Sequence, residues 1–216
     1  MAVPGRRNGL MDDEEDEEGL FDEVEGEAWA DLQRDVPPHL RALVDAAQRG
    51  NVDALRLALD NHNGSIDDPV EDGDTVLHLS CLYGYLPCVQ AKSSSQLLLQ
   101  RGANLESKDE EGAIPLHDAC AGGFTDIVQY IINFAGSPEC VERMLNTTDA
   151  EGDTPLHHAA RGEHLDVIRL LLAAGACPKK TNAYEKTPAE LASQDTEVQS
   201  VLTAAAASAP DAVCCQ

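Results

Sequence analysis

Residues 149–181 constrain the fold of this chain more than any other part of its sequence. This segment contains a turn glycine, Gly152, followed by T-P-L-H-H-A-A and then by V-I-R-L-L-L-A-A-G-A. Glycine suits a turn that needs a positive φ, because it has no Cβ to clash. Thr154 can cap a helix that begins at Pro155, since proline has no N–H to leave unpaired and its φ is already helical. A second, apolar helix is expected over residues 165–174.

Variants of this segment recur along the chain, and together they resemble the ankyrin repeat, whose period is near 33 residues. The resemblance rests on G-x-T-P-L-H-x-A-A, the downstream V-I-x-L-L-L and the closing G-A of residues 149–181. It implies an all-α repeat solenoid of paired antiparallel helices with β-hairpin finger loops. One helix pair cannot bury its own apolar face, so stability requires neighbouring repeats on either side.

We expect an ankyrin repeat domain over residues 37–205, between a disordered acidic arm (1–36) and a flexible tail (206–216). Its units are an N-terminal cap (39–70), full repeats at 71–108, 109–148 and 149–181, and a C-terminal cap (182–203). The first cap lacks the T-P-L-H box but carries two apolar stripes, the second of which includes Leu55, Leu57 and Leu59. A capping repeat must be polar on its outer side to stop the stack.

Two of the repeats are longer than the family period, because successive turn glycines are 39 and 40 residues apart. The first surplus predicts a loop or break at 91–96: six extra residues turn a continuous helix by about 240° and would move Leu97–Leu99 off the apolar face. This insertion is either an in-frame addition at an exon junction or an ordinary tolerated insertion. The second surplus predicts a short extra helix with Ser137 as its cap.

The segment before the repeats is strongly acidic. Residues 12–35 hold 13 acids and one base, Arg34, in a chain whose formal net charge is −24. Such a block repels itself and cannot bury enough apolar surface to fold alone. The segment is either a solubilising tail or a stretch that folds onto a basic partner or onto the domain's own groove. Its large apolar residues are Leu20, Phe21, Val24, Trp29 and Leu32.

Charge and cysteine usage narrow the class of protein. A net charge of −24 argues against direct binding to nucleic acid or to an anionic membrane. Seven cysteines form an odd count without regular spacing, which argues against a disulfide framework. Cys81 and Cys120 replace a small box alanine and are expected in the core. No apolar run is long enough to span a bilayer, and no signal or transit peptide is evident. We expect a cytoplasmic or nuclear monomer.

The recurring histidines raise the question of metal binding or catalysis. The resemblance implies instead that each box histidine bonds the box threonine and the neighbouring turn, and that adjacent repeats stack about 10 Å apart, too far to share one ion. His158 and His164 show no cysteine or carboxylate at ligand spacing. Without a P-loop, a nucleophile elbow or an acid–base pair, we expect no catalytic residue, no metal, no cofactor and no enzyme activity. The structural box residues are Gly73, Thr75, His78, Gly112, Pro115, His117, Gly152, Thr154, Pro155 and His157.

The second repeat departs from the box at one position. Ile114 stands where threonine is expected, so a helix cap is lost. On capping energies alone, Ile114→Thr is expected to stabilise the protein by about 0.5–1 kcal/mol.

The resemblance also implies that a partner protein is bound by the finger tips and by the exposed side of the first helices. An acidic rim over an aromatic floor fits a basic, partly apolar protein face, whereas a generic solvated edge is the alternative. The finger acids are Glu71, Asp72, Asp74, Asp109, Glu110, Glu111, Asp149, Glu151 and Asp153. The groove residues are Leu79, Leu82, Tyr83, Tyr85, Asp118, Phe124, His158 and Arg161.

The sequence therefore predicts a non-enzymatic adaptor that binds one or more proteins, with a basic partner as the expected kind. Two alternatives stay open. The first is a chaperone or inhibitor of a basic client, in which the acidic arm is the working part. The second is an adaptor tethered weakly to a membrane by a lipid on Cys214 or Cys215; a prenylation box is absent, because it needs a cysteine four residues from the end.

Overall fold

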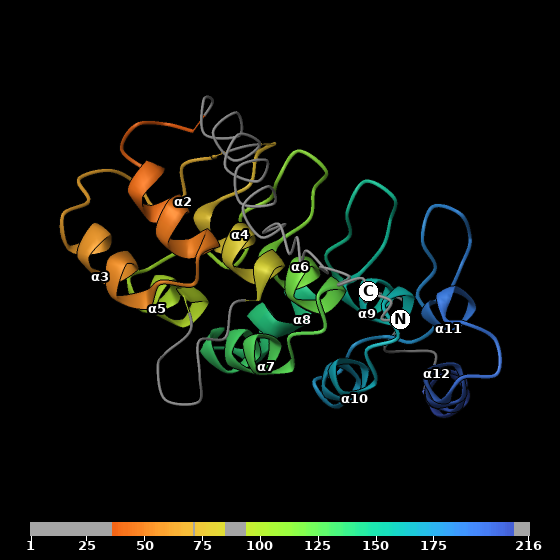
Figure 1. The fold of residues 1–216 in the computed structure, drawn as a ribbon. Coiled ribbons are helices and arrows are strands. Elements are labelled where there is room, and N and C mark those ends of the chain that lie inside the picture. Colours follow the sequence, from red (N-terminus) through yellow and green to blue (C-terminus); the bar gives the residue numbers. More distant parts are fainter. Residues whose placement is uncertain (1–35, 71, 85–93, 210–216) are drawn as a thin grey trace, which may run out of the picture. The chain divides into compact units, whose positions relative to one another are not determined.

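The computed structural model describes residues 36–70, 72–84 and 94–209. Within this part of the chain, helices follow one another in pairs and no strand occurs (Figure 1). The helices are α2 (Arg41–Gln48), α3 (Val52–Asp60), α4 (Val76–Tyr83), α5 (Ser94–Gln100), α6 (Pro115–Ala121), α7 (Thr125–Phe134), α8 (Pro138–Asn146), α9 (Pro155–Arg161), α10 (Leu165–Ala173), α11 (Pro188–Leu191) and α12 (Glu197–Ser208).

The paired helices form two rows. The first helices of the pairs (α2, α4, α6, α9, α11) pack side by side, and the second helices (α3, α5, α7, α10, α12) form a row beneath them (Figure 1). The core lies between the rows, where one leucine recurs at the same position of three first helices: Leu77, Leu116 and Leu156 are each at most 1% exposed. The all-α repeat fold predicted from the sequence is confirmed.

The fingers that link successive pairs are tight turns. In the second finger, for example, Asp109 N–H donates to the Ala113 carbonyl at 3.1 Å. Each finger is also joined to the next by a backbone bond: Glu110 N–H donates to the Asp72 carbonyl at 2.9 Å, Ala150 N–H to the Glu111 carbonyl at 2.6 Å, and Ala183 N–H to the Glu151 carbonyl at 2.8 Å. Strands of the expected β-hairpins are therefore absent from the described residues, because each finger is too short to build a ladder.

The turn glycines behave as the sequence predicts. Gly73, Gly112 and Gly152 have φ values of 80°, 79° and 77°. The last finger makes the same turn with Glu185 at φ 58°. This left-handed conformation is costly for a residue with a Cβ, so the last turn is held by its neighbours.

The two insertions have different outcomes. The predicted extra helix is confirmed as α8: Ser137 caps it by accepting from Cys140 N–H at 3.2 Å, and Met144 and Leu145 are buried. The prediction was a loop or break at 91–96: a loop is wrong for residues 94–96, because α5 begins at Ser94, and residues 91–93 lie outside the described part. A helix that begins at Ser94 sets its own phase, so Leu97–Leu99 are all buried.

The N-terminal cap differs from expectation on its outer side. Leu55 and Leu59 are buried as expected, but Leu57 is 65% exposed. Leu57, Ala54 and Ala58 line an open groove of about 440 Å³ with residues of α2. The expectation of a polar outer face is wrong here, because small apolar side chains cover this side of the helix pair.

The C-terminal cap and the cysteines complete the fold. The last helix, α12, continues to Ser208, past the boundary at 205 that the sequence suggested. Cys81 and Cys120 are buried free thiols, as expected, whereas Cys177 is disulfide-bonded. None of the described helices is long and apolar enough to cross a membrane. The predictions for the acidic arm, Cys214 and Cys215 fall outside the described residues.

Candidate functional site

The box histidines join each repeat to the next. In the first full repeat, His78 Nδ1 accepts the Thr75 N–H at 3.1 Å, so Nε2 carries the proton and donates to the Ala113 carbonyl at 3.4 Å. The same two bonds recur at His117, with Ile114 N–H and the Asp153 carbonyl, and at His157, with Thr154 N–H and the Lys186 carbonyl.

Burial keeps these histidines neutral. It lowers the pKa of His78 and His157, and it lowers the pKa of His117 to about 4, with His158 contributing. A neutral ring with both nitrogens bonded to the protein has no lone pair left for a metal or a substrate proton. These hydrogen bonds are the kind that the resemblance implied for the box histidines, although His117 pairs with an isoleucine at the threonine position.

Three of the nine predicted finger acids are used inside the fingers. Asp109 Oδ1 accepts the Ala113 N–H at 2.8 Å, and Asp149 Oδ1 accepts the Asp153 N–H at 2.8 Å. Asp153 is fully buried and its carboxylate accepts from Arg161 and from Asn182. These carboxylates close the turns, so the interpretation of all nine as a free acidic row needs correction.

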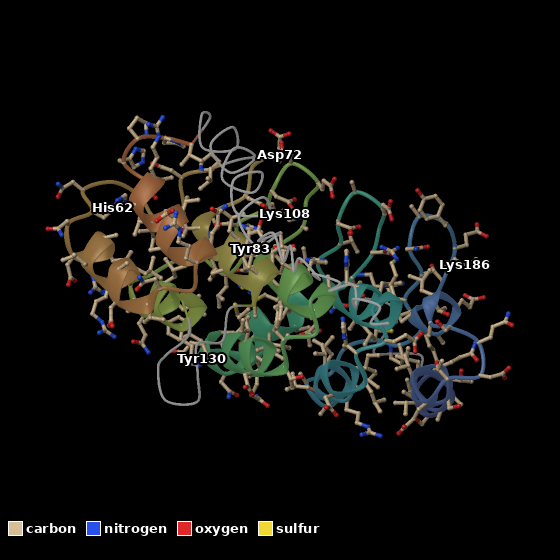
Figure 2. The ribbon with its side chains drawn as sticks, in the orientation of Figure 1. His62, Asp72, Tyr83, Lys108, Tyr130 and Lys186 are labelled. Atoms are coloured by element: carbon tan, nitrogen blue, oxygen red, sulfur yellow. The ribbon has the colours of Figure 1, made fainter. Side chains whose placement is uncertain are left out.

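The remaining finger acids define the acidic rim: Asp72, Glu110, Glu111 and Glu151, all exposed. Asp72 lies at the end of the first finger, away from the helices (Figure 2). Glu151 is 3.5 Å from Arg161. Glu71 lies outside the described residues, and Asp74 is partly buried at the start of α4. Lys108 is exposed at the base of the second finger (Figure 2).

The predicted groove residues also divide into exposed and structural ones. Leu79 belongs to the core, at 6% exposure, because it faces the neighbouring repeats. Leu82 is 44% exposed and Tyr83 is partly buried on α4, so these two offer apolar surface. The ring of Phe124 packs on two glycines: a Cβ on Gly84 or on Gly122 would lie within 2.2 Å of it. Phe124 therefore acts as a packing residue, and Tyr85 lies outside the described part.

In the third full repeat, the two predicted groove residues have internal partners. His158 Nε2 lies 2.8 Å from Asp149 Oδ2. The expectation that His158 has no carboxylate at ligand spacing is therefore wrong, because the turn of the third finger folds back over α9. Arg161 forms an ion pair with the buried Asp153, and about half of the Arg161 side chain stays exposed.

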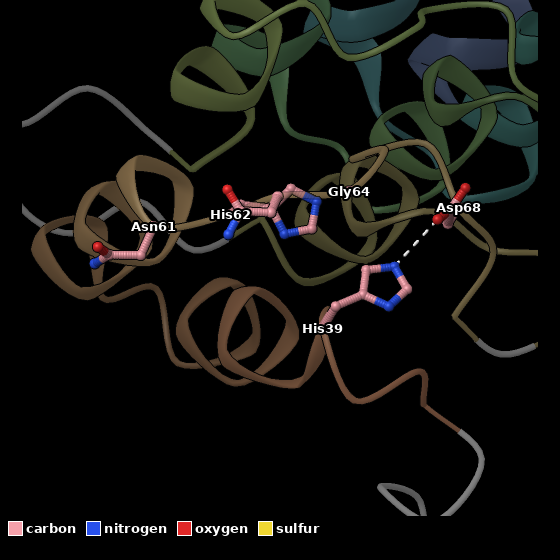
Figure 3. A pocket seen from close by; sticks show the side chains of 6 residues that line it. His39, Asn61, His62, Gly64 and Asp68 are labelled. Carbon is pink, nitrogen blue, oxygen red and sulfur yellow. Dashed lines mark hydrogen bonds and ion pairs between the residues drawn. The ribbon is translucent and has the colours of Figure 1, made fainter.

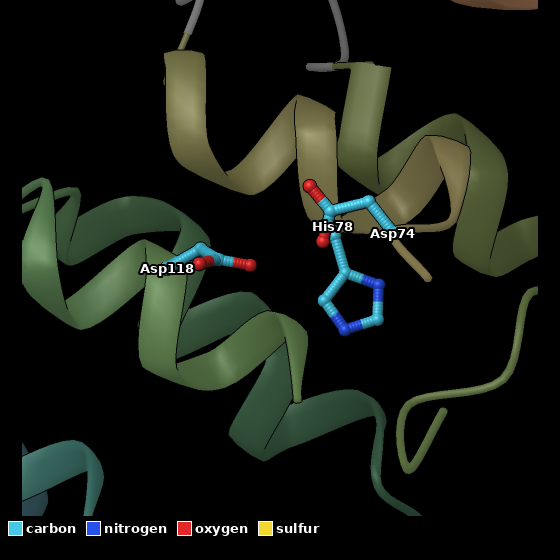
Figure 4. Close-up of side chains that lie close together, drawn as sticks. All are labelled: Asp74, His78 and Asp118. Atoms are coloured by element: carbon cyan, nitrogen blue, oxygen red, sulfur yellow. The ribbon is translucent and has the colours of Figure 1, made fainter. Parts of the chain in front are cut away.

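The carboxyl of Asp118 on α6 lies near other acids and lacks a hydrogen-bond donor for one of its oxygens among the described residues. Its Oδ2 atom is buried and accepts no hydrogen bond from the described residues. Burial raises the pKa of Asp118 to about 8, with further contributions from Asp74, Asp109 and Glu111. Figure 4 shows its carboxyl reaching from α6 toward Asp74 and His78. The sequence placed Asp118 on the groove side, but no sequence signal showed that its carboxyl would be buried among other acids.

Two side-chain groups come close enough to suggest a metal site: Asp74, His78 and Asp118, and Asp149, Asp153 and His158. In the first group, both nitrogens of His78 already serve the hydrogen bonds given above. In the second, both carboxylates accept bonds from the protein. His78 thus has no free nitrogen for an ion in the first group, and the carboxylates of the second group are committed to the fold, so we assign no metal to either group.

Comparison with known proteins agrees with this architecture. The family described as "Ankyrin repeats (3 copies)" matches residues 43–138, 90–182 and 134–206. Protein phosphatase 1 regulatory subunit 27 of Mus musculus is 32% identical over 42% of this chain and 54% of its own length. Ankyrin repeat domain-containing protein 63 of Mus musculus is 33% identical over 50% of this chain and 27% of its own length. This chain thus spans about half or less of these two relatives.

A shorter relative is covered more fully. Notch-regulated ankyrin repeat-containing protein A of Danio rerio is 33% identical over 44% of this chain and 82% of its own length. The helix pairs, the histidine-linked fingers and these matches agree with one another. The chain therefore belongs to the ankyrin repeat family, whose repeats are protein–protein interaction modules.

Proposed function

We propose that this chain is a non-enzymatic adaptor that holds a partner protein on the surface formed by its first two full repeats. The contact surface comprises the acidic rim at Asp72, Glu110 and Glu111, the apolar residues Leu82 and Tyr83, and the carboxyl of Asp118. We further propose that the partner supplies a lysine or arginine that meets Asp118.

The observation that carries this proposal is the buried, unbonded Oδ2 of Asp118. A buried carboxyl without a donor costs folding stability and gives nothing to the fold in return. Residues that cost stability in this way, with a strongly shifted pKa, are candidates for function. A cationic side chain would supply the missing donor and offset the neighbouring carboxylates.

The surroundings support a basic ligand. Asp74, Asp109 and Glu111 act on Asp118 with the same sign of charge, and Lys108 is the exposed cation near them. A complementary positive group on a partner speeds association and selects against acidic competitors. Leu82 and Tyr83 add apolar area beside the charge, as in the core of a typical interface.

The names of the relatives fit an adaptor. One is a regulatory subunit of a phosphatase, which by its name acts on another protein. We infer that this chain works in the same general way, by holding a protein rather than by performing chemistry.

The test is affinity capture from cell extract, followed by affinity measurement on the captured protein. Asp118→Asn removes the charge and keeps the shape; Asp126→Asn, at an exposed acid on α7, is the matched control. We expect Asp118→Asn to weaken binding about tenfold or more, since loss of one member of a buried charge pair typically costs 2–5 kcal/mol, and Asp126→Asn to have little effect. Equal affinities for the two variants would reject the proposed contact.

The acidic arm supports the second candidate function, a chaperone or inhibitor of a basic client. The specific observation is the block of 13 acids in residues 12–35. Deleting residues 1–36 separates the two functions. An adaptor keeps its partner after the deletion, whereas an acidic chaperone loses its client.

A further inference from the structure

The loop between α3 and the first finger contains an Asn-Gly pair, Asn63–Gly64, and both residues are exposed. A Cβ added to Gly64 would lie 2.9 Å from His39 Cδ2 and 3.3 Å from the Nε2 atoms of both His39 and His62. The two imidazole rings are stacked, with centroids 5.7 Å apart. Figure 3 shows them with Asp68 around a pocket of about 390 Å³. The Asn-Gly peptide therefore lies beside two rings that can accept a proton.

The two histidines differ in their hydrogen bonds. His39 Nε2 lies 3.1 Å from Asp68 Oδ2, so this nitrogen serves as a donor to the carboxylate. His62 Nε2 is buried and has no hydrogen-bond partner among the described residues. Buried polar atoms are nearly always bonded, so an exception calls for an explanation. His62 Nε2 is thus the uncommitted imidazole nitrogen next to Gly64.

The backbone of Gly64 is equally uncommitted. Its N–H donates no hydrogen bond to residues 36–70, 72–84 or 94–209. Because glycine has no Cβ, the Gly64 nitrogen can come close to the side-chain Cγ of the preceding asparagine without a clash. The nucleophile, the acceptor carbon and a base are therefore within one loop.

We propose that Asn63–Gly64 is a deamidation site in which His62 takes up the Gly64 amide proton. The Gly64 nitrogen attacks Asn63 Cγ and forms a new C–N bond, while the proton passes through His62 to the departing side-chain nitrogen, which leaves as ammonia. Water then opens the cyclic imide. Attack at the former side-chain carbonyl gives aspartate, and attack at the backbone carbonyl gives isoaspartate.

The product changes the N-terminal cap in two ways. Either product places a new negative charge in the loop whose Asp68 pairs with His39. Isoaspartate also routes the backbone through the former side chain, which adds one methylene to the connection between α3 and the first finger. The reaction thus acts on the loop that links the cap to the first finger.

The sequence supplies an internal reference, because Asn8–Gly9 repeats the dipeptide elsewhere in the chain. The full chain is incubated at neutral pH, and mass-spectrometric peptide mapping follows conversion at both asparagines in the same sample. We expect Asn63 to convert about tenfold faster than Asn8. A positioned general base typically raises a reaction rate by about 10²–10⁴-fold, so this expectation is a modest one. Asn63→Gln should remove the fast reaction.

His62→Gln tests the base directly. We expect it to lower the Asn63 rate to about that of Asn8, with Asn8 itself unchanged and the circular dichroism spectrum as in the unmodified chain. An Asn63 rate no higher than that of Asn8 in the wild-type chain, a comparison that needs no variant, would overturn the proposal. So would a folded His62→Gln variant that keeps the fast reaction.

Discussion

The carboxyl of Asp118, which carries the proposed contact, also makes the stability of the fold depend on pH. Its pKa is raised from the ordinary 3.8 to about 8, so between these values the folded state holds a proton that the unfolded state releases. Stability therefore falls as the pH rises from about 4 to about 8. Burial, the main cause of the shift, penalises the charged form of the carboxyl and leaves the neutral form nearly unaffected.

Asp118→Asn should stabilise the protein because an amide carries no charge to desolvate. We expect a gain of about 1–3 kcal/mol at pH 8, on the scale of an unsatisfied buried polar group, and a smaller gain at pH 5. Urea unfolding at the two pH values measures both. A variant that is no more stable than the wild type at pH 8 would show that the charge is compensated in solution.

At Ile114, the structure adds a cost that capping energies do not include. Ile114 is only 1% exposed, so a threonine there loses a buried ethyl group while it gains a hydroxyl that can bond His117. In the other repeats, the threonine hydroxyls lie 3.0 Å and 2.8 Å from the histidine Nδ1.

The comparison that isolates the cap is Ile114→Thr against Ile114→Val, because these two variants have the same shape. We expect threonine to be more stable than valine by about 0.5–1.5 kcal/mol, the value of one hydrogen bond, as measured by thermal melting. The reverse change, Thr154→Val, is the control and should cost a similar amount. If valine equals threonine at 114, His117 gains nothing from a hydroxyl.

Among the elements, helix α3 contains leucines that look alike in the sequence but differ in burial in the fold. Leu55, Leu57 and Leu59 fall within one apolar run, but only Leu57 faces the outside. In a helix, residues two positions apart point about 200° apart, so Leu57 could share a face with the other two only in a strand. We expect Leu55→Ala to cost about 2–5 kcal/mol and Leu57→Ala less than about 0.5 kcal/mol in urea unfolding.

Much of the fold could be predicted because its signals are local. The glycines at 73, 112 and 152, the proline-started helices and the Ser137 cap each act within four residues of themselves. The start of α5 was not predicted, because each of the three serines in residues 93–95 is a good helix cap and the sequence does not choose among them. The apolar outer face of the N-terminal cap was missed for a related reason: alanines at 54 and 58 read equally well as core or surface.

The site was harder to predict than the fold. The sequence identified the finger acids as a set. It could not show which of them hydrogen-bond within the fold and which stay exposed, because that depends on contacts made after folding. Asp149 and Asp153 bond the fold, whereas Glu110 and Glu111 stay exposed. Asp118 looks like the other acids in the sequence, and only its packing beside Asp74 sets it apart.

At the scale of the whole domain, the pH dependence of stability combines groups of opposite sign. His78, His117 and His157 have lowered pKa values in the folded state. The unfolded state therefore binds more protons as the pH falls through 6.5, and the stability that the histidines contribute is lost; for His117 this loss extends down to about pH 4. For His117 alone this amounts to about 3 kcal/mol, at about 1.4 kcal/mol for each unit of pKa.

Asp118 acts in the other direction, because its folded pKa is raised. As the pH rises through the ordinary histidine pKa of 6.5, the unfolded state loses its histidine protons and the three histidines add stability; about one pH unit above 6.5 they are neutral in both states, and the continued loss of the Asp118 proton lowers stability until about pH 8. We expect a stability maximum near pH 7 in urea unfolding measured from pH 5 to pH 8.5. In Asp118→Asn the alkaline decline should disappear and the acid decline should remain. A wild-type curve that still rises between pH 7.5 and pH 8 would contradict this account, because the box histidines are neutral in both states there.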